Sequence, residues 1–271
     1  MSLTTDYTTG ARRAPAAIRE LPTAAVLGFP IVLGDYEDVM DWMDATIQRR
    51  GSAYVTAAAV HLVMVAREDP EVHRAVRKAI TVPDGQPLVW ALRALGHRHA
   101  SRVYGPDLMA RYCERAASRT GARMFLYGGR DAMALQQLID ALKARFPGLD
   151  IVGAYSPPYR DLTDAERAAV TEEINRSGAD VVWVGTGQPK QEKWMAQMRG
   201  RLIAPILVGV GAAFDFHAGL VPQAPAWMQR VGLEWLFRLV QEPRRLWRRY
   251  ARYNPRFVAA FMREFAARGR R

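Results

Sequence analysis

Two charged residues of this chain stand where a catalytic group is expected. Asp84 comes directly after a short apolar segment (residues 80–82) and before Gly85, so its carboxylate is available at the edge of a predicted sheet. The same position also suits an aspartate that only hydrogen-bonds its own turn. Arg102 stands just before a predicted helix start at Pro106, and it is either a member of the same site or an arginine of the solvated surface.

Glycines close three other predicted strands. Gly128 and Gly185 each follow an apolar run, and Gly211 follows a third. Glycines at such positions let backbone N–H groups and helix N-termini approach a phosphate. The dinucleotide fingerprint that residues 209–211 begin lacks its third glycine, which disfavours a nicotinamide site. A different phosphorylated ligand is therefore expected.

Polar side chains gather directly after Gly185. Gln188, Gln191 and Glu192 lie within one strand–helix junction, and the Gly-X-Gly sequence before them favours contact with a ligand over simple exposure. The chain holds no Asp-X-Asp sequence, and its five histidines do not form a ligand set, so we expect neither a metal nor another cofactor. Catalysis is then expected to rely on protein dipoles and arginines.

Apolar segments of strand length alternate with segments of helical periodicity between residues 23 and 222. The predicted strands cover residues 23–29, 53–56, 80–82, 123–127, 151–155, 181–184 and 206–210. This alternation predicts the α/β class, with a doubly wound, mostly parallel Rossmann-like sheet and helices on both faces. Ligands of such sheets bind beyond the carboxyl ends of the strands, where the candidate residues stand.

The two ends of the chain differ from this α/β body. Residues 1–22 form a polar leader, and residues 223–271 read as helices without strands between them. The segment 241–271 carries ten arginines and two glutamates, so it accounts for +8 of the net charge of +11. The sequence therefore predicts a basic helical appendage with an anionic partner, which is a phospholipid, a pyrophosphate or a nucleic acid.

Four aromatic residues of this tail are spaced three or four apart and share one side of a helix: Trp247, Tyr250, Tyr253 and Phe257. Such a stripe suits a membrane interface, stacking on single-stranded nucleic acid, or packing on the body as core. Residues 1–20 lack the apolar stretch of a signal peptide, and residues 202–221 are too interrupted to span a membrane. We expect a cytoplasmic protein that is peripheral on the inner face of the plasma membrane.

A longer series of short motifs stands in order between residues 23 and 255. It comprises Thr56, Asp84-Gly85 and residues 102–108, 127–129, 187–192, 209–211, 214–215, 218–219, 224–225, 232–238 and 242–245. Pro-Lys-Gln-Glu at 189–192 and Leu-Glu-Trp-Leu at 233–236 are its most specific parts. The series resembles the WecG/TagA/CpsF glycosyltransferase family, which includes N-acetylmannosaminyltransferases of wall teichoic acid and enterobacterial common antigen and a glucosyltransferase of xanthan assembly.

The resemblance implies an inverting, metal-independent transfer from a UDP-sugar to a saccharide linked to polyprenyl diphosphate, in the synthesis of a bacterial surface polysaccharide or exopolysaccharide. Asp84 is then the base that deprotonates the acceptor hydroxyl, with Thr56 and Arg102 in the same pocket. The nucleotide-sugar site is formed by Gly128, Gly185, Gln188, Gln191, Glu192, Gly211 and Asp215. Arginines of the appendage close over the donor diphosphate, and the best matches are Arg238, Arg245 and Arg248.

Ala58 departs from the family's pattern, because many members carry asparagine there and use it to position the sugar or the acceptor. We expect His61 or another polar group to take over that role, and the identity of the donor sugar stays open. A basic nucleic-acid-binding α/β protein is the alternative from another class. The glycine-rich strand ends favour the enzyme, with a nucleotide-sugar donor, a lipid-linked acceptor and an anionic membrane surface as partners and no nucleic acid; a homo-oligomer is compatible with this.

Overall fold

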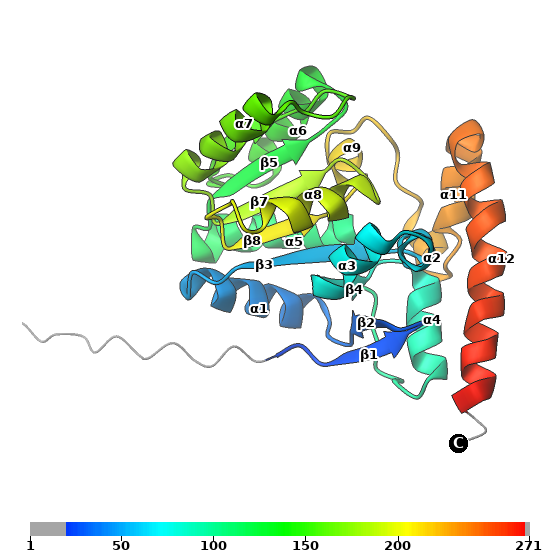
Figure 1. Cartoon of the computed structure of the whole chain (residues 1–271). Helices are drawn as coiled ribbons and strands as arrows, with labels where there is room; N and C mark the ends of the chain where they lie inside the picture. Colours follow the sequence, from blue (N-terminus) through cyan, green and yellow to red (C-terminus); the bar gives the residue numbers. More distant parts are fainter. Residues whose placement is uncertain (1–19, 269–271) are drawn as a thin grey trace, which may run out of the picture.

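The computed structural model describes residues 20–268, and a parallel sheet lies at its centre (Figure 1). Its six strands are ordered β4-β3-β8-β7-β5-β6, and every neighbouring pair is parallel. The strands are β3 (Ala53–Ala58), β4 (Ile80–Pro83), β5 (Met124–Gly128), β6 (Ile151–Tyr155), β7 (Val181–Gly185) and β8 (Ile206–Gly209). The predicted fold class is confirmed. The predicted leader lies outside the described residues except for its last three.

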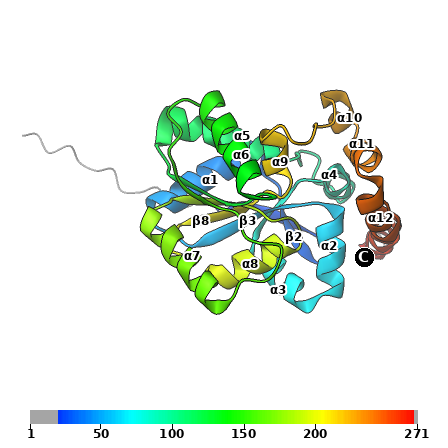
Figure 2. The same cartoon turned by 90° about the horizontal axis from the view of Figure 1, so that it is seen from above.

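Side chains of each central strand alternate between the two faces of the sheet, as the two-residue period of a strand requires. Met124 and Leu126 pack into the core on one face, whereas Phe125 and Tyr127 pack into the core on the other. Both faces are covered by helices, as Figure 2 shows. One face carries α1 (Tyr36–Gln48), α5 (Gly105–Arg115) with the π-helical turn η1 (Ala116–Thr120), α6 (Ala132–Arg145) and α9 (Ala213–His217); the other carries α3 (Pro70–Lys78), α7 (Asp164–Ser177) and α8 (Lys190–Met198).

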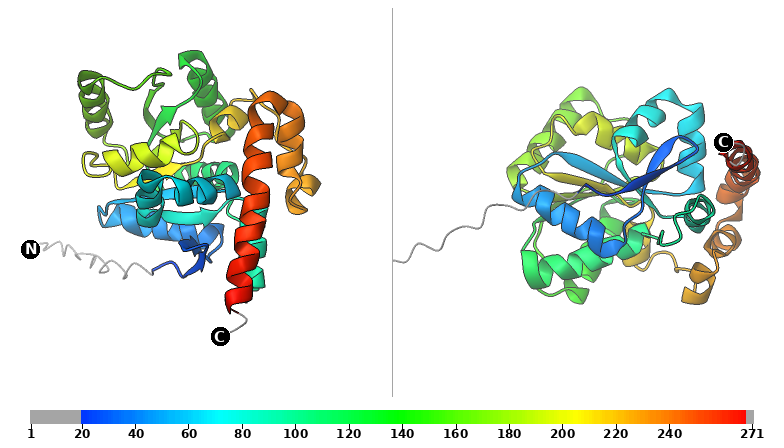
Figure 3. Two further views of the ribbon diagram at one scale, coloured as in Figure 1. Left: turned by 45° about the vertical axis from the view of Figure 1, so that its right-hand side comes forward. Right: turned by 90° about the horizontal axis from the view of Figure 1, so that it is seen from below.

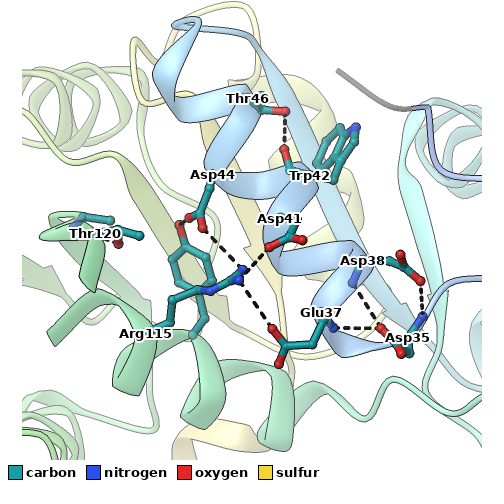
Figure 4. Close-up of polar contacts among 11 residues, drawn as sticks. Asp35, Glu37, Asp38, Asp41, Trp42, Asp44, Thr46, Arg115 and Thr120 are labelled. Carbon is teal, nitrogen blue, oxygen red and sulfur yellow. Dashed lines mark hydrogen bonds and ion pairs between the residues drawn. The ribbon is translucent and has the colours of Figure 1, made fainter. Parts of the chain in front are cut away.

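Polar contacts define where α1 begins and how it meets α5 (Figure 4). The Asp35 carboxylate accepts the N–H groups of Glu37 and Asp38, and the Asp38 carboxylate accepts the Asp35 N–H in return. This capping box satisfies backbone donors that have no partner within the helix. Arg115 of α5 forms ion pairs with three acidic side chains of α1, namely Glu37 at 3.4 Å, Asp41 at 2.6 Å and Asp44 at 3.3 Å.

Residues 23–29 do not form one strand of the main sheet, as predicted, but belong to a separate antiparallel hairpin. Its strands are β1 (Thr23–Val26) and β2 (Phe29–Val32). Leu27 and Gly28 have positive φ angles of 51° and 85°, as the type I′ form of a two-residue hairpin turn requires. The hairpin packs with α2 (Val60–Glu68), α3 and α4 (Gln86–Ala94).

The C-terminal helices stand along one side of the body, where α12 runs beside α2 (Figures 1 and 3). They are α10 (Ala226–Arg230), α11 (Glu234–Gln241) and α12 (Pro243–Arg268). Gly232, at φ +72°, separates α10 from α11. No helix within residues 20–268 is long and apolar enough to cross a membrane.

The predicted aromatic stripe of α12 mostly packs on the body. Phe257 is buried, and Tyr253 packs into the same core cluster between the hairpin and α2. Tyr250 lines a cavity, described below, and only Trp247 is exposed, by 52%. Core packing is therefore the correct interpretation for Tyr253 and Phe257, and any contact of α12 with lipid must use a different face.

Candidate active site

The candidate site lies where the direction of the chain across the sheet reverses. β3 leads to β4 at one edge, whereas β8 is reached from β7 on the opposite side, so β3 and β8 flank a topological switch point. Beyond the carboxyl ends of these strands, a cavity of about 960 Å³ lies between the sheet and helices α11 and α12. Its size is that of a small-molecule binding site.

Asp84 lies in the wall of this cavity, immediately after β4. The Gly105 N–H donates to its Oδ1 at 2.7 Å, whereas Oδ2 has no hydrogen bond to any part of residues 20–268. Burial raises the pKa of Asp84 to about 6, although the positive charge of Arg102 opposes the rise. One carboxylate oxygen is therefore held by the backbone, and the other is left for a ligand.

Arg102 and Glu234 form an ion pair beside Asp84. Arg102 Nη2 lies 2.5 Å from Glu234 Oε2, and Arg102 Nε donates to the backbone carbonyl of Asp84. The guanidinium also lies over the ring of Tyr104, with Cζ 4.2 Å from the ring centre. Arg102 is thus bonded to the body through Asp84 and to α11 through Glu234.

Three residues that the sequence assigned to the site lie beneath the cavity and not in its lining. Thr56 Oγ1 donates to Glu192 Oε1 at 2.6 Å, and Gln191 Nε2 donates to the same oxygen at 2.8 Å. Gln191 Oε1 accepts the Gly211 N–H at 3.0 Å, and Gly211 does line the cavity. Because Thr56, Gln191 and Glu192 are fully buried, they can support the Gly211 loop in this structure but do not reach the cavity.

Asp215 and Gln188 line the cavity near the ends of β3, β5 and β8. The Asp215 carboxylate accepts two hydrogen bonds from the guanidinium of Arg130, at 2.9 Å from Nε and 3.3 Å from Nη2. Gln188 Nε2 donates to the carbonyl of Ala57 at 2.6 Å. Both side chains are therefore held in fixed positions by paired groups of the body.

The strand-end glycines permit close packing. A Cβ atom on Gly128 would lie 2.7 Å from the carbonyl carbon of Gly185, and a Cβ atom on Gly185 would lie 2.5 Å from the ring of Phe214. Gly185 lines the cavity, whereas Gly128 stands behind it and the next residue, Gly129, forms the wall. Gly128 therefore acts on the site through packing.

Arginines of α11 and α12 form the basic wall of the cavity: Arg238, Arg245 and Arg249. The Nε atoms of Arg238 and Arg249 are buried without a hydrogen-bond partner among residues 20–268. Unpaired buried donors are costly unless a ligand satisfies them, so this wall suits an anion. Arg248 does not line the cavity; it is exposed, with its guanidinium 5.4 Å from the ring of Trp247.

A comparison with protein-family models matches residues 24–271 to the glycosyl transferase WecG/TagA/CpsF family. The chain belongs to this family. Among curated relatives, it is 27% identical over 231 residues to the N-acetylglucosaminyldiphosphoundecaprenol N-acetyl-beta-D-mannosaminyltransferase of Bacillus subtilis strain 168, covering 84% of this chain and 87% of the relative. It is 30% identical over 216 residues to the Bacillus spizizenii (strain ATCC 23059 / NRRL B-14472 / W23) enzyme of the same name, covering 79% of this chain and 80% of that enzyme.

Family membership favours one of the two classes that the sequence left open: this chain is a glycosyltransferase. The residues that its structure gathers around the cavity are Asp84, Arg102, Gly185, Gln188, Gly211, Asp215, Arg238 and Arg245. Among residues 20–268, no three His, Cys, Asp or Glu side chains are grouped so that they could hold a metal ion.

Sequence reasoning missed several charged residues of this glycosyltransferase's cavity, and Glu234 and Arg249 are two of them. Glu234 stands within the Leu-Glu-Trp-Leu motif, so its motif was visible but its pairing with Arg102, 132 positions earlier, was not. Arg249 follows Arg248 directly, and only the rotation of α12 about its axis decides which of the two faces the cavity.

His61 is a further cavity residue, and its role could not be assigned from the sequence. Its ring lies 5.2 Å from that of Tyr253 at 74°, and its Nδ1 is buried without a partner among the described residues. Burial, with a contribution from Arg249, lowers the pKa of His61 to about 4, so the imidazole is neutral at pH 7. It is a polar group of the cavity wall, whereas Ala58 is fully buried and does not line the cavity.

Proposed function

We propose that this glycosyltransferase moves a sugar, with inversion and without a metal ion, from a UDP-sugar to a saccharide linked to polyprenyl diphosphate, in the synthesis of a bacterial surface polysaccharide. The observation that carries the proposal is Asp84, whose Oδ1 is held by Gly105 and whose Oδ2 is unpaired in the cavity. The two Bacillus relatives support the acceptor class, because their names describe transfer to N-acetylglucosaminyldiphosphoundecaprenol.

In the proposed reaction Asp84 removes the proton of the acceptor hydroxyl as its oxygen attacks the anomeric carbon of the donor. The bond between that carbon and the diphosphate oxygen breaks, and UDP leaves with the bonding electron pair. A pKa of about 6 leaves Asp84 ionised at neutral pH while keeping it a stronger base than an ordinary aspartate. A single displacement of this kind inverts the anomeric centre.

The departing diphosphate requires positive charge, and the arginine wall supplies it. Arg238, Arg245 and Arg249 come from α11 and α12 and face the same cavity as Asp84. Charge-assisted hydrogen bonds from such groups stabilise a developing diphosphate without a divalent ion. Asp215, held by Arg130, and the Gly211 loop are proposed to bind the nucleotide on the sheet side.

The outer face of α12 supports a peripheral position at the cytoplasmic leaflet. Four of its exposed side chains are large and apolar and recur at whole helical turns, so they share one face: Trp247, Val258, Met262 and Phe265. Exposed arginines, Arg244, Arg248 and Arg263, accompany them on the same helix. Apolar side chains next to arginines suit the interface of an anionic bilayer.

A transfer assay with defined substrates tests the proposal. Full-length protein is incubated with a panel of UDP-sugars and a short-chain polyprenyl diphosphate carrying N-acetylglucosamine, with and without chelator. We expect one UDP-sugar to give stoichiometric UDP and an extended lipid whose new linkage, read by NMR, is opposite in configuration to the donor. Retention of configuration, or turnover that chelation abolishes and a divalent ion restores, would contradict the corresponding part of the proposal.

A further inference from the structure

The pair formed by Arg102 and Glu234 joins two parts of the molecule that are far apart in sequence. Arg102 precedes α5 in the body, and Glu234 is the first residue of α11. Their side chains are 16% and 14% exposed, so water screens the 2.5 Å contact only weakly. The other side of the same guanidinium donates from Nε to the Asp84 carbonyl. One arginine therefore connects the turn that bears Asp84 to the start of α11.

The position of Glu234 is set by how α11 docks. Gly232, just before α11, packs so closely on α4 that an added Cβ atom would lie 2.8 Å from the ring of Trp90. This contact brings the first turn of α11 against the body. A glutamate in the first turn is also favoured by the helix dipole, so its carboxylate is well placed to receive Arg102.

The charges around Asp84 show what this pair does to it. Arg102 lowers the pKa of Asp84 and Glu234 raises it, while Arg238 lowers it and the ring of Tyr104 is the other titratable group at the same place. The negative charge of Glu234 therefore partly cancels the effect of the Arg102 charge on the pKa of Asp84. Without Glu234, the Nη2 donor of Arg102 would lose its carboxylate partner.

We propose that Glu234 is a positioning residue that, by holding Arg102, keeps the carboxylate of Asp84 available to act as the base. This inference rests on the proposed function, in which Asp84 is the base. Because Glu234 accepts from Arg102 Nη2, this donor is engaged, and Asp84 Oδ2 is left to accept a proton from the acceptor.

Substitutions of the two partners test the proposal, because they should shift the pKa of Asp84 in opposite directions. In the wild type, the acid limb of the kcat/KM profile is expected near the Asp84 pKa of about 6. We expect Glu234→Gln to shift this limb to lower pH by roughly one unit and to reduce kcat at pH 7 by about 10-fold or more. Arg102→Gln should shift the limb to higher pH. The double variant is expected to return the limb to the wild-type position or above it.

A matched control and a readout independent of turnover complete the experiment. Glu264→Gln neutralises a glutamate of α12 that accepts the Leu27 N–H and pairs with Arg268, without touching Arg102 or Asp84, so the acid limb should stay in place. The Asp84 carboxyl carbon, assigned by NMR in ¹³C-aspartate protein against Asp84→Asn, should titrate at lower pH in Glu234→Gln. If that variant does not fold, Glu234→Asp keeps the charge but cannot span the contact, so it should release Arg102 and shift the acid limb to lower pH by less than Glu234→Gln does.

The outcomes separate this inference from the proposed function. If Asp84→Asn keeps wild-type turnover, Asp84 is not the base and the proposed function fails with it. If Asp84→Asn is inactive but Glu234→Gln moves neither the acid limb nor the carboxyl titration, only the inference is overturned. A loss of kcat in Glu234→Gln with an unmoved titration would show a purely structural contact and would likewise overturn it.

Discussion

Arg248 and Arg249 are adjacent on α12, yet only Arg249 lines the active-site cavity, while Arg248 is exposed beside Trp247. The pair provides a matched comparison within one helix, because the two substitutions remove the same charge from two different environments. Leu246 and Phe257, buried on the body side of α12, fix the rotation of the helix and therefore this difference.

Arg249→Ala is expected to weaken UDP binding by about 10-fold to 100-fold, which corresponds to loss of a charge-assisted hydrogen bond to the diphosphate. Arg248→Ala should leave UDP binding unchanged and reduce binding to anionic vesicles by about 1 kcal/mol. Isothermal titration with UDP and vesicle sedimentation measure the two effects. Equal losses of UDP affinity in both variants would contradict the orientation of α12.

Asp84→Asn is expected to reduce turnover by about 10² to 10⁴-fold, because the isostere removes the base. The amide oxygen can still accept the Gly105 N–H, so the turn and UDP binding should stay nearly intact. Asp140→Asn on α6 is the matched control and should be fully active, because the exposed Asp140 accepts a hydrogen bond from Gln136 on the surface and does not line the cavity. Transfer assays and UDP-induced thermal stabilisation of both variants provide the measurement; wild-type turnover in Asp84→Asn would reduce Asp84 to a turn residue.

Glu192 should make the stability of the protein depend on pH. Burial raises its pKa from 4.5 to about 7, so the folded state binds this proton more tightly than the unfolded state. The unfolding free energy should therefore fall as pH rises from about 4.5 to about 7, by up to about 3 kcal/mol from this group. Glu192→Gln removes that contribution.

Urea denaturation at a series of pH values, wild type against Glu192→Gln, isolates the effect as a difference that changes across this window. Glu172→Gln replaces an exposed glutamate that pairs with Arg176 on α7, and its difference from the wild type should be flat. A flat difference for Glu192→Gln as well would show that Glu192 ionises normally when folded.

The exposed apolar face of α12 is expected to bind lipid. The double variant Val258→Ser/Phe265→Ser should bind vesicles containing phosphatidylglycerol several-fold more weakly, because it removes apolar area from the interface. Its turnover with a soluble short-chain acceptor should be unchanged, because neither residue lines the cavity.

Ile203→Ser is the control for this face, since Ile203 is 72% exposed in the segment that leads into β8, at the opposite edge of the sheet from the cavity. Vesicle binding of full-length protein should also fall with rising salt, because the arginines of α12 contribute electrostatically. Vesicle binding that is unaffected by both the double substitution and salt would place the membrane contact elsewhere.

The alternation of apolar strand and helix segments was sufficient to predict the parallel sheet and the edge of the sheet at which the site lies. Alternating strands and helices allow few topologies, and the carboxyl ends of parallel strands meet at one edge, so Asp84, Gly185, Gly211 and the strands before them were predicted together. These features follow from the order of strands and helices along the chain, which local sequence determines. The one misassigned strand, at residues 23–29, contains the turn at Leu27 and Gly28, whose positive φ no hydrophobic pattern reveals.

Whether a given side chain points into the cavity or away from it became evident only from how the helices pack on the sheet. Thr56 looked like a pocket residue, but it points to Glu192 beneath the cavity, because helix α8 packs there. Glu234 meets Arg102 only because α11 docks on α4, a contact between segments more than a hundred residues apart. Such pairings depend on how whole helices pack against the sheet, which the spacing of residues along the chain does not encode.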